Sequence, residues 1–175
     1  MIIRRASRDD TPELEQLIDA SIRVLGGKFY NEQEIEESLV HVFGVDTTMI
    51  DDETYFVIQS ESRIVGAGGW SHRKTPFGGD QAQPVRDAKY RSPGRDPAVI
   101  RAMFVHPDLA RKGIGRLIIE HCEGEARKAG FQKFELVATL SGVSFYERMG
   151  YRKVNSLLYD MPIGSIKFVR MVNSS

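Results

Sequence analysis

The chain contains a single cysteine, Cys122, so no disulfide bond can form within it. Its apolar runs are all shorter than the roughly 18 residues that a membrane-spanning helix needs. The opening residues, MIIRRASRDD, turn polar too soon for a secretory leader. No amphipathic segment is basic and apolar enough to bind a bilayer surface. These absences predict a cytoplasmic protein without a membrane partner.

A charge excess of either sign is also missing, because 24 Lys and Arg residues balance 24 Asp and Glu residues. A surface that binds single-stranded nucleic acid combines basic and aromatic residues, and the two short basic clusters, around Arg4 and around Arg111, are not interleaved with aromatics. The four histidines are scattered without the close spacing of a zinc site. We therefore expect neither a nucleic-acid partner nor a bound metal.

What the sequence does contain is a series of strand-like and helix-like segments over 175 residues, a length typical of one domain. Helical spacing of apolar residues and capping residues predict helices, and β-rich runs bounded by polar turns predict strands. The order strand, helix, strand after residue 98 favours a right-handed βαβ unit with parallel strands. The expected strands cover 1–6, 54–60, 63–71, 98–105, 133–140, 151–161 and 165–172, and the expected helices cover 10–25, 31–44, 114–129 and 144–151.

Residues 73–97 interrupt this series with a long loop. The segment holds four of the seven prolines and shows no lasting hydrophobic period. Long loops in compact domains are either functional or tolerated excursions of the surface. A lid over a ligand, a surface excursion and a contact with a second subunit are therefore all open interpretations of this loop.

The stretch LARKGIGRLIIEHCEGEARKAGF places two glycines at the start of an amphipathic helix. A helix N-terminus offers unpaired N–H groups and the positive end of the helix dipole, so it binds phosphate where side chains leave room. Gly113 and Gly115 leave that room, and Arg111, Lys112 and Arg116 add positive charge. The turn lacks the G-x-G-x-x-G of dinucleotide sites and the GKS or GKT of P-loops. It predicts a pyrophosphate site of another type, and a purely conformational or packing role of the glycines is the alternative.

The segment MFVHPDLARKGIGRLIIEHCEGEARKAGF, followed by ELVATLSGVSFYERMGY, resembles the acyl-CoA-binding half of GNAT-type N-acetyltransferases. The likeness is densest over Val99–Tyr151, and the order of elements agrees with the family over nearly the whole chain. The resemblance implies an α/β (α+β) fold in which residues 1–175 form a single acetyltransferase domain with an acyl-CoA-binding core at 98–151. It also implies a mixed sheet of about seven strands, about four flanking helices and a V-shaped cleft between the fourth and fifth strands.

The same resemblance assigns residues to acetyl-CoA, the cosubstrate of the family. The glycine turn would hold the pyrophosphate, and the strand before it would pair with the pantetheine. Ala110 replaces the Gln or Arg that usually opens the turn, and Thr139 stands where many members carry an asparagine. The implied cofactor-binding residues are Met103, Phe104, Val105, Arg111, Lys112, Gly113, Ile114, Gly115, Arg116, Thr139 and Tyr146.

Tyr146, in the motif FYERMGY, matches the family tyrosine that protonates the leaving thiolate. A phenol with a pKa of about 10 is protonated at neutral pH and suits this acid role. No single base emerges for the acceptor amine. We expect a water relay with His72 as the named candidate, and Glu53 is a further candidate. Cys122 lies on the apolar face of a helix, which predicts direct acyl transfer in a ternary complex rather than an acyl-enzyme.

The acceptor is expected to be a primary amine of a small molecule or a peptide. By analogy with the family, its lining would include Phe29, Tyr30, Trp70 and His72. Transfer of a longer acyl group is a second enzymatic possibility. A hypothesis from another class is a non-catalytic acyl-CoA-binding sensor or regulatory module. The family also forms homodimers, so a homodimer is a possible assembly.

Overall fold

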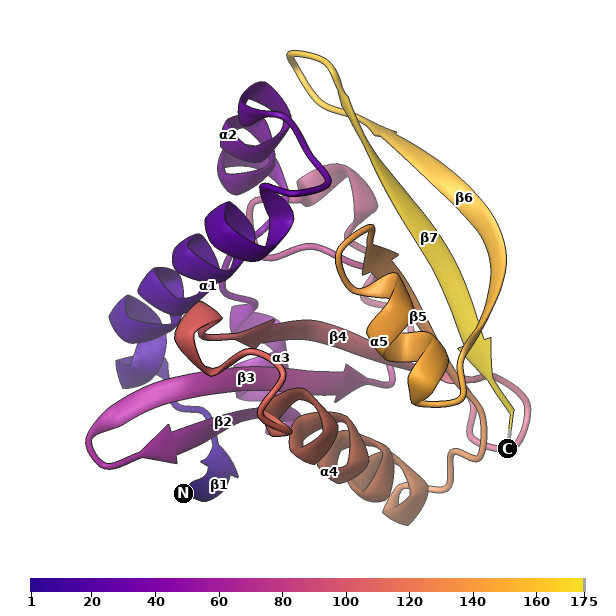
Figure 1. Cartoon of the computed structure of the whole chain (residues 1–175). Coiled ribbons are helices and arrows are strands. Elements are labelled where there is room, and N and C mark those ends of the chain that lie inside the picture. Colours follow the sequence, from indigo (N-terminus) through magenta and orange to yellow (C-terminus); the bar gives the residue numbers. More distant parts are fainter. Residues whose placement is uncertain (175) are drawn as a thin grey trace.

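The computed structural model describes residues 1–174, which form a seven-stranded mixed sheet with helices on both faces (Figure 1). The strand order is β1-β2-β3-β4-β5-β7-β6. This architecture confirms the fold class expected from the sequence. The strands are β1 (Ile2–Arg5), β2 (Tyr55–Ser60), β3 (Arg63–Ser71), β4 (Ala98–Val105), β5 (Phe134–Thr139), β6 (Arg152–Asp160) and β7 (Ser165–Asn173). The helices are α1 (Thr11–Gly26), α2 (Glu32–His41), α3 (Thr47–Asp51), α4 (Ile114–Lys128) and α5 (Val143–Arg148), with 3-10 turns at Arg8–Asp10, Gln83–Val85 and Pro107–Leu109.

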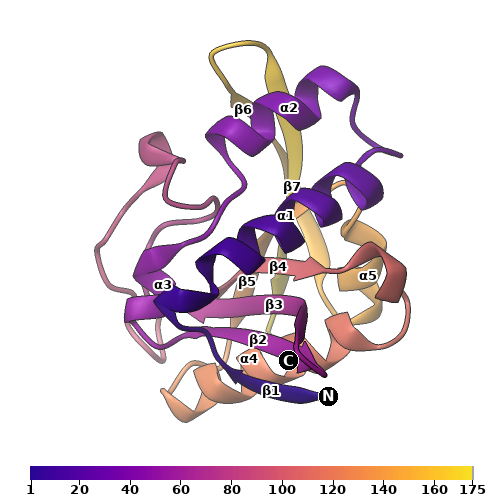
Figure 2. The same cartoon turned by 90° about the vertical axis from the view of Figure 1, so that its left-hand side faces the viewer.

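The two faces of the sheet carry separate hydrophobic cores. Helices α1 and α2 cross one face, and α4 and α5 lie on the other (Figures 1 and 2). Successive side chains of a strand point to opposite faces, so Tyr55 and Val57 of β2 pack with α1 and α3, whereas Phe56 and Ile58 pack with α4. Burial on both faces explains why the β2 sequence is a continuous apolar run.

The central strands β4 and β5 are parallel and separate along their length. They pair only at their first residues, Ala98 with Phe134 and Val99 with Glu135. Beyond this point β5 continues to pair with β7, as far as Thr139 opposite Phe168. The sheet therefore opens into the predicted V-shaped cleft, and the β5-facing edge of β4 from Ile100 onward has no strand partner among residues 1–174.

A bulge in β4 lies beside this cleft. Two residues, Ala102 and Met103, occupy the space opposite Gly68 of β3, and Ala102 has a φ of +55°. The extra residue leaves the regular ladder and bends the strand. The bulge therefore contributes to the divergence of β4 from β5.

Two local features differ from the sequence-based expectation. The second helix ends at His41 rather than near Gly44, and a fifth helix, α3, follows it. Asp46 caps α3 by accepting a hydrogen bond from the amide of Met49. Five residues are too few to produce a hydrophobic period, so only the cap signals this helix in the sequence.

Candidate active site

The turn before α4 has the backbone shape that its glycine predicts. Gly113 caps α4 in the left-handed region with a φ of +87°, where a side chain costs free energy. A Cβ built on Gly113 would meet no atom within 4 Å, so the space above the turn is open. Arg111 also has a positive φ, of +63°. The chain thus folds back sharply and presents its amides outward at the start of a 15-residue helix.

The amides of this turn are available to a ligand. Apart from hydrogen bonds within helices and strands, the N–H groups of residues 111–116 donate to no backbone carbonyl of the described chain. Within the described chain, the side chains of Arg111 and Lys112 form no ion pair, and Arg116 only contacts exposed Glu120 at 3.4 Å. Free amides, the helix dipole and exposed positive side chains are together the features that suit an anion.

The second glycine of the motif has a packing role. A Cβ on Gly115 would lie 3.1 Å from the ring of Phe145, so α4 and α5 approach closely there. Glycines of β3 act in the same way, because a Cβ on Gly66 would lie 2.7 Å from Ile114 and one on Gly68 would overlap Ile118. Gly113 therefore leaves the space above the turn open, whereas Gly115, Gly66 and Gly68 let α4 lie close to its neighbours.

A cavity of about 70 Å³ lies where β4 and β5 separate. It brings together four residues that the sequence predicts for the cofactor site, namely Met103, Phe104, Thr139 and Tyr146. The other predicted cofactor residues, Val105 and 111–116, lie further along the same chain segment, at the end of β4 and at the start of α4. The strand β4 and the residues that follow it thus join the cavity to the turn at 111–116.

Tyr146, on α5, reaches the cavity from the side of α4. Its ring packs edge-on against Phe145 and Tyr151, with centroids 5.1 and 6.0 Å away. Burial raises the pKa of the Tyr146 phenol above its usual value, so the group is protonated at neutral pH. The phenol forms no hydrogen bond with another residue of the described chain, whereas the hydroxyl of Thr139 forms a hydrogen bond with that of Ser141 at 3.0 Å.

The sulfur of Cys122 lies on the buried face of α4 and has no exposure. Burial raises the pKa of this thiol far above its ordinary value, so a thiolate nucleophile is disfavoured. Cys122 does not line the cavity. Its position agrees with the packing role inferred from the sequence.

The four residues predicted to line the acceptor site do not line this cavity. Phe29 is 55% exposed, and Tyr30 is buried, with its hydroxyl donating to Lys167 O at 2.6 Å and accepting from Leu140 N at 2.9 Å. Burial raises the pKa of Tyr30 to about 12. Tyr30 therefore links the α1–α2 connection to β7 and to the residue that follows β5.

Trp70 and His72 lie beside the closed end of the V. Trp70 is opposite Ile100 in the ladder and packs on Phe131, and His72 stacks on Tyr90 at 5.0 Å. Burial lowers the pKa of His72, so its imidazole is neutral at neutral pH. Glu53 is exposed and contacts Arg5. The structure thus places both candidate bases outside the cavity.

Other residues, not singled out from the sequence, form the wall of the cavity opposite Tyr146. They come from the connection after α2 and from the 73–97 loop. The wall consists of Phe43, Gly44, Pro76, Phe77, Gly78 and Gly79. These residues lie in irregular segments, where hydrophobic periodicity gives no indication of what they face.

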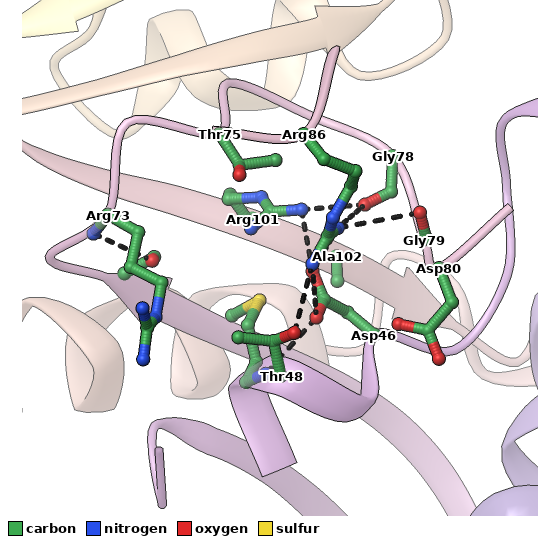
Figure 3. A network of polar contacts seen from close by, with 12 residues as sticks. Asp46, Thr48, Arg73, Thr75, Gly78, Gly79, Asp80, Arg86, Arg101 and Ala102 are labelled. Atoms are coloured by element: carbon green, nitrogen blue, oxygen red, sulfur yellow. Dashed lines mark hydrogen bonds and ion pairs between the residues drawn. The ribbon is translucent and has the colours of Figure 1, made fainter. Parts of the chain in front are cut away.

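Next to this wall, two arginines converge on one carboxylate, and one of them, Arg101, also lines the cavity (Figure 3). Arg101, on β4, donates to Asp46 at 2.7 Å and to the carbonyl of Gly78 at 2.6 Å, and Arg86 donates to Asp46 at 3.0 Å. The Asp46 and Arg101 side chains are only 0 and 2% exposed. The Nε of Arg101 is buried and has no hydrogen-bond partner in the described chain. One signal was present in the sequence: a lone arginine within the apolar run AVIRAMFV.

Burial shifts the protonation equilibria of this cluster. Burial by itself would raise the pKa of Asp46, but the hydrogen bond from Arg86 and the charges of both arginines bring it below its usual value. Burial lowers the pKa of Arg101, and Asp46 opposes that change. An arginine remains protonated in proteins, so the cluster holds two positive charges and one negative charge.

The acetyltransferase (GNAT) domain family matches residues 51–153, which include β4, the glycine turn, α4, β5 and Tyr146. The chain belongs to the GNAT acetyltransferase family. The match begins at the end of α3 and reaches β6, so it covers the V-shaped cleft and the anion-binding turn of the GNAT fold.

Solved GNAT structures share this fold at low sequence identity. A GCN5-related N-acetyltransferase from Rhodopseudomonas palustris is 18% identical, with a TM-score of 0.72 over 99% of this chain and 95% of that one. PaiA N-acetyltransferase from Thermoplasma acidophilum, solved with coenzyme A, is 15% identical, with a TM-score of 0.65 over 99 and 98%. Ribosomal-protein-alanine N-acetyltransferase from Brucella melitensis is 16% identical, with a TM-score of 0.64 over the full length of both chains. No curated protein sequence matches the chain.

The residues of the turn fit the cosubstrate of a GNAT protein. Free amides and unpaired basic side chains suit a pyrophosphate, and the unpaired edge of β4 suits the amide groups of a pantetheine arm. Within residues 1–174, no group of three His, Cys, Asp or Glu side chains could hold a metal ion. No helix in that range has the length and hydrophobicity required to span a bilayer.

Proposed function

We propose that the protein is an N-acetyltransferase that moves the acetyl group of acetyl-CoA directly to a primary amine in a ternary complex. The observation that carries this proposal is the separation of β4 from β5. The edge of β4 that this separation leaves unpaired runs from the cavity that contains Tyr146 toward the turn at 111–116, which follows β4 in the chain. Family membership supports an acetyltransferase, and the choice of an amine acceptor is our inference.

In this proposal the backbone provides most of the cosubstrate site. The amides of Arg111, Lys112, Gly113, Ile114, Gly115 and Arg116 bind the pyrophosphate. The main chain of Met103, Phe104 and Val105 pairs with the pantetheine arm, and Thr139 offers a hydroxyl from β5. A β4 amide near the reacting carbonyl stabilises the negative charge that develops on its oxygen. Acetyl-CoA, when bound, supplies a thioester whose sulfur departs as the amine attacks the carbonyl carbon.

Tyr146 acts as the general acid. As the C–N bond forms and the C–S bond breaks, its phenol gives a proton to the sulfur and regains one from water, while the amine nitrogen releases a proton to water. Burial raises the pKa of the phenol, so the group is protonated at neutral pH and can donate a hydrogen bond to the departing sulfur. The sum of these transfers is one proton moved from nitrogen to sulfur.

A water relay replaces a dedicated base in the proposed mechanism. No Asp, Glu or His side chain of the described chain lines the cavity. His72 remains a prediction from the sequence, and its stacking on Tyr90 beside the closed end of the cleft does not support it. Cys122 takes no part in the transfer, because its thiol is buried outside the cavity.

Calorimetric titration with acetyl-CoA, combined with a thiol-release assay over small amines and peptide N-termini, tests the proposal. Binding together with release for one class of amine is the expected result. Binding without release for every amine would favour the alternative, an acyl-CoA-binding sensor. Absence of binding would refute the assignment of the turn. The same titration with longer acyl-CoA compounds tests the second enzymatic possibility.

The remaining sequence-based expectations belong to this proposal. We propose one acetyltransferase domain over 1–175, with 73–97 as an inserted loop and 98–151 as the acyl-CoA-binding core. A cytoplasmic location is proposed from the single cysteine, and a homodimer from the resemblance.

A further inference from the structure

A buried tyrosine of β2 reaches across β3 to the bulge in β4. The hydroxyl of Tyr55 donates a hydrogen bond to the carbonyl of Ala102 at 3.2 Å, although β3 lies between the two strands. The Tyr55 ring lies against Gly69 of β3, where an added Cβ would be 3.0 Å from the ring. The absence of a side chain on Gly69 therefore lets the ring cross β3 and reach β4.

The carbonyl that accepts this hydrogen bond belongs to a strained residue. Ala102 has a φ of +55°, a left-handed conformation that costs an L-residue free energy and persists only where surrounding contacts fix it. The regular ladder does not fix it, because Ala102 and Met103 together lie opposite Gly68. The Tyr55 hydroxyl is a contact that fixes the bulge from outside the ladder.

The Tyr55 side chain is suited to a fixed structural contact. It has no exposure and packs with α1 and α3, so no solvent competes for its hydroxyl. Burial raises the pKa of this phenol far above its ordinary value, so the group stays protonated and remains a hydrogen-bond donor. Tyr55 does not line the cavity, and it reaches the site only through Ala102.

The direction of the Ala102 carbonyl determines the direction of the next amide. No peptide bond of the described chain is cis, and the C=O and N–H of a trans peptide point in opposite directions. A carbonyl held toward Tyr55 thus turns the N–H of Met103 away from the face that carries α1 and α3. The opposite face carries α4 and α5, and Met103 packs there together with Tyr146. Ala102, Met103 and Tyr146 also line the same cavity.

We propose that Tyr55 is a positioning residue for acetyl transfer, which holds the Ala102 carbonyl so that the N–H of Met103 faces the thioester oxygen of acetyl-CoA. This inference rests on the proposed N-acetyltransferase function and adds a residue that does not touch the substrate. As the amine attacks, negative charge develops on the thioester oxygen. An amide that is already oriented stabilises this charge without reorganisation.

Tyr55→Phe removes the hydroxyl and keeps the ring, so it releases the Ala102 carbonyl with little change in packing. Loss of an oxyanion donor costs about a hundredfold or more in kcat; here the donor remains but is held less well, so we expect a loss of about tenfold. The Kd for acetyl-CoA should stay close to that of the wild type, because the interaction strengthens only in the transition state. An unchanged kcat, or a loss that appears only in the Kd, would overturn the inference.

Thr54→Val is a matched control for the deletion of a buried hydroxyl. Thr54 precedes Tyr55 and donates its hydroxyl to a different backbone carbonyl, that of Met49, at 3.4 Å. Thr54 does not line the cavity and does not contact the bulge through this bond. The control should retain the kcat of the wild type, and thermal melting gives the stability loss of both variants. A similar loss of kcat in both variants would show that a looser core, rather than the bulge, controls turnover.

NMR of acetyl-CoA labelled with carbon-13 at its carbonyl observes the hydrogen bond without an acceptor amine. A hydrogen bond to the oxygen polarises the carbonyl and moves the carbon resonance downfield. Binding to the wild type and to Thr54→Val should move the resonance downfield by the same amount, and binding to Tyr55→Phe should move it less. An equal movement in Tyr55→Phe would contradict the inference.

These measurements distinguish failure of the inference from failure of the proposed function. If amines release thiol and Tyr55→Phe matches the wild type in kcat and in the carbon resonance, the inference fails and the N-acetyltransferase function stands. If no amine releases thiol from the wild type, the proposed function fails, and the carbon resonance decides whether Tyr55 orients the amide. If acetyl-CoA does not bind, both fail.

Discussion

Replacement of Gly113 by alanine tests the anion-binding turn with a single methyl group. A left-handed conformation costs an L-residue about 1–2 kcal/mol, and Gly113 has a φ of +87°. Because no protein atom lies within 4 Å of the added Cβ, no steric clash adds to that cost. We expect a loss of about 1 kcal/mol in the free energy of unfolding, which corresponds to about 2–4 °C in the melting temperature of a chain of this size.

The effect on acetyl-CoA should be larger than the effect on stability. The methyl group projects into the space where the phosphate approaches the amides, or the backbone relaxes and turns the amides away. Either change weakens several hydrogen bonds to a charged group, each worth about 1.5–3 kcal/mol. We therefore expect at least a tenfold increase in the Kd for acetyl-CoA, measured by calorimetry.

A matched control separates strain from ligand contact. Gly94 has a φ of +83°, and a Cβ there would also meet no atom within 4 Å, but Gly94 lies outside the turn and the cavity. Gly94→Ala should lower the melting temperature by a similar amount and leave the Kd unchanged. An unchanged Kd in folded Gly113→Ala protein would refute the assignment of the turn.

Three further predictions concern the acid, the helix contact and the buried cluster. Tyr146→Phe should lower kcat about a hundredfold with little change in acetyl-CoA affinity, because the phenol acts only as sulfur leaves; an unchanged kcat would refute the acid role. Gly68→Ala adds a Cβ that overlaps Ile118 and Met103, so denaturant unfolding should show a loss of about 1–3 kcal/mol, and wild-type stability would contradict the packing role. The pKa of Asp46 is lowered on folding, so its contribution to stability is present above its ordinary value of 3.8 and is lost as pH falls through the folded value. Stability measured at decreasing pH should therefore fall less steeply in Asp46→Asn than in wild type, and parallel curves would show that Asp46 does not contribute.

The hydrophobic pattern predicted most of the fold. Both hairpins and the parallel β4–β5 pair appear as expected, because strand and helix periods are local properties of the chain. The opening of the cleft followed from the family resemblance rather than from the pattern. The helix α3 was not predicted, because its five residues are too few to show a hydrophobic periodicity.

The residues predicted for the cosubstrate come from a few neighbouring segments of the chain. The turn at 111–116 and the bulged end of β4 belong to one continuous segment, and Tyr146 follows within a recognisable motif. The residues predicted for the acceptor lie far apart in the chain, so no local pattern relates them. Phe29, Tyr30, Trp70 and His72 do not line the cavity, and their assignment to the acceptor stays a prediction.

The sequence by itself determined the order of the elements, the left-handed turn at Gly113 and the placement of Tyr146 on a helix after β5. These features depend on spacing, capping and backbone preference over a few residues. Only the tertiary structure decided which residues line the cavity and that Arg86 and Arg101 converge on Asp46. Asp46 and Arg101 are 55 positions apart in the chain, and Arg86 reaches Asp46 from a loop without a repeating pattern. Contacts of this kind depend on the path of the whole chain, because burial and charge pairing act between segments that are distant in sequence.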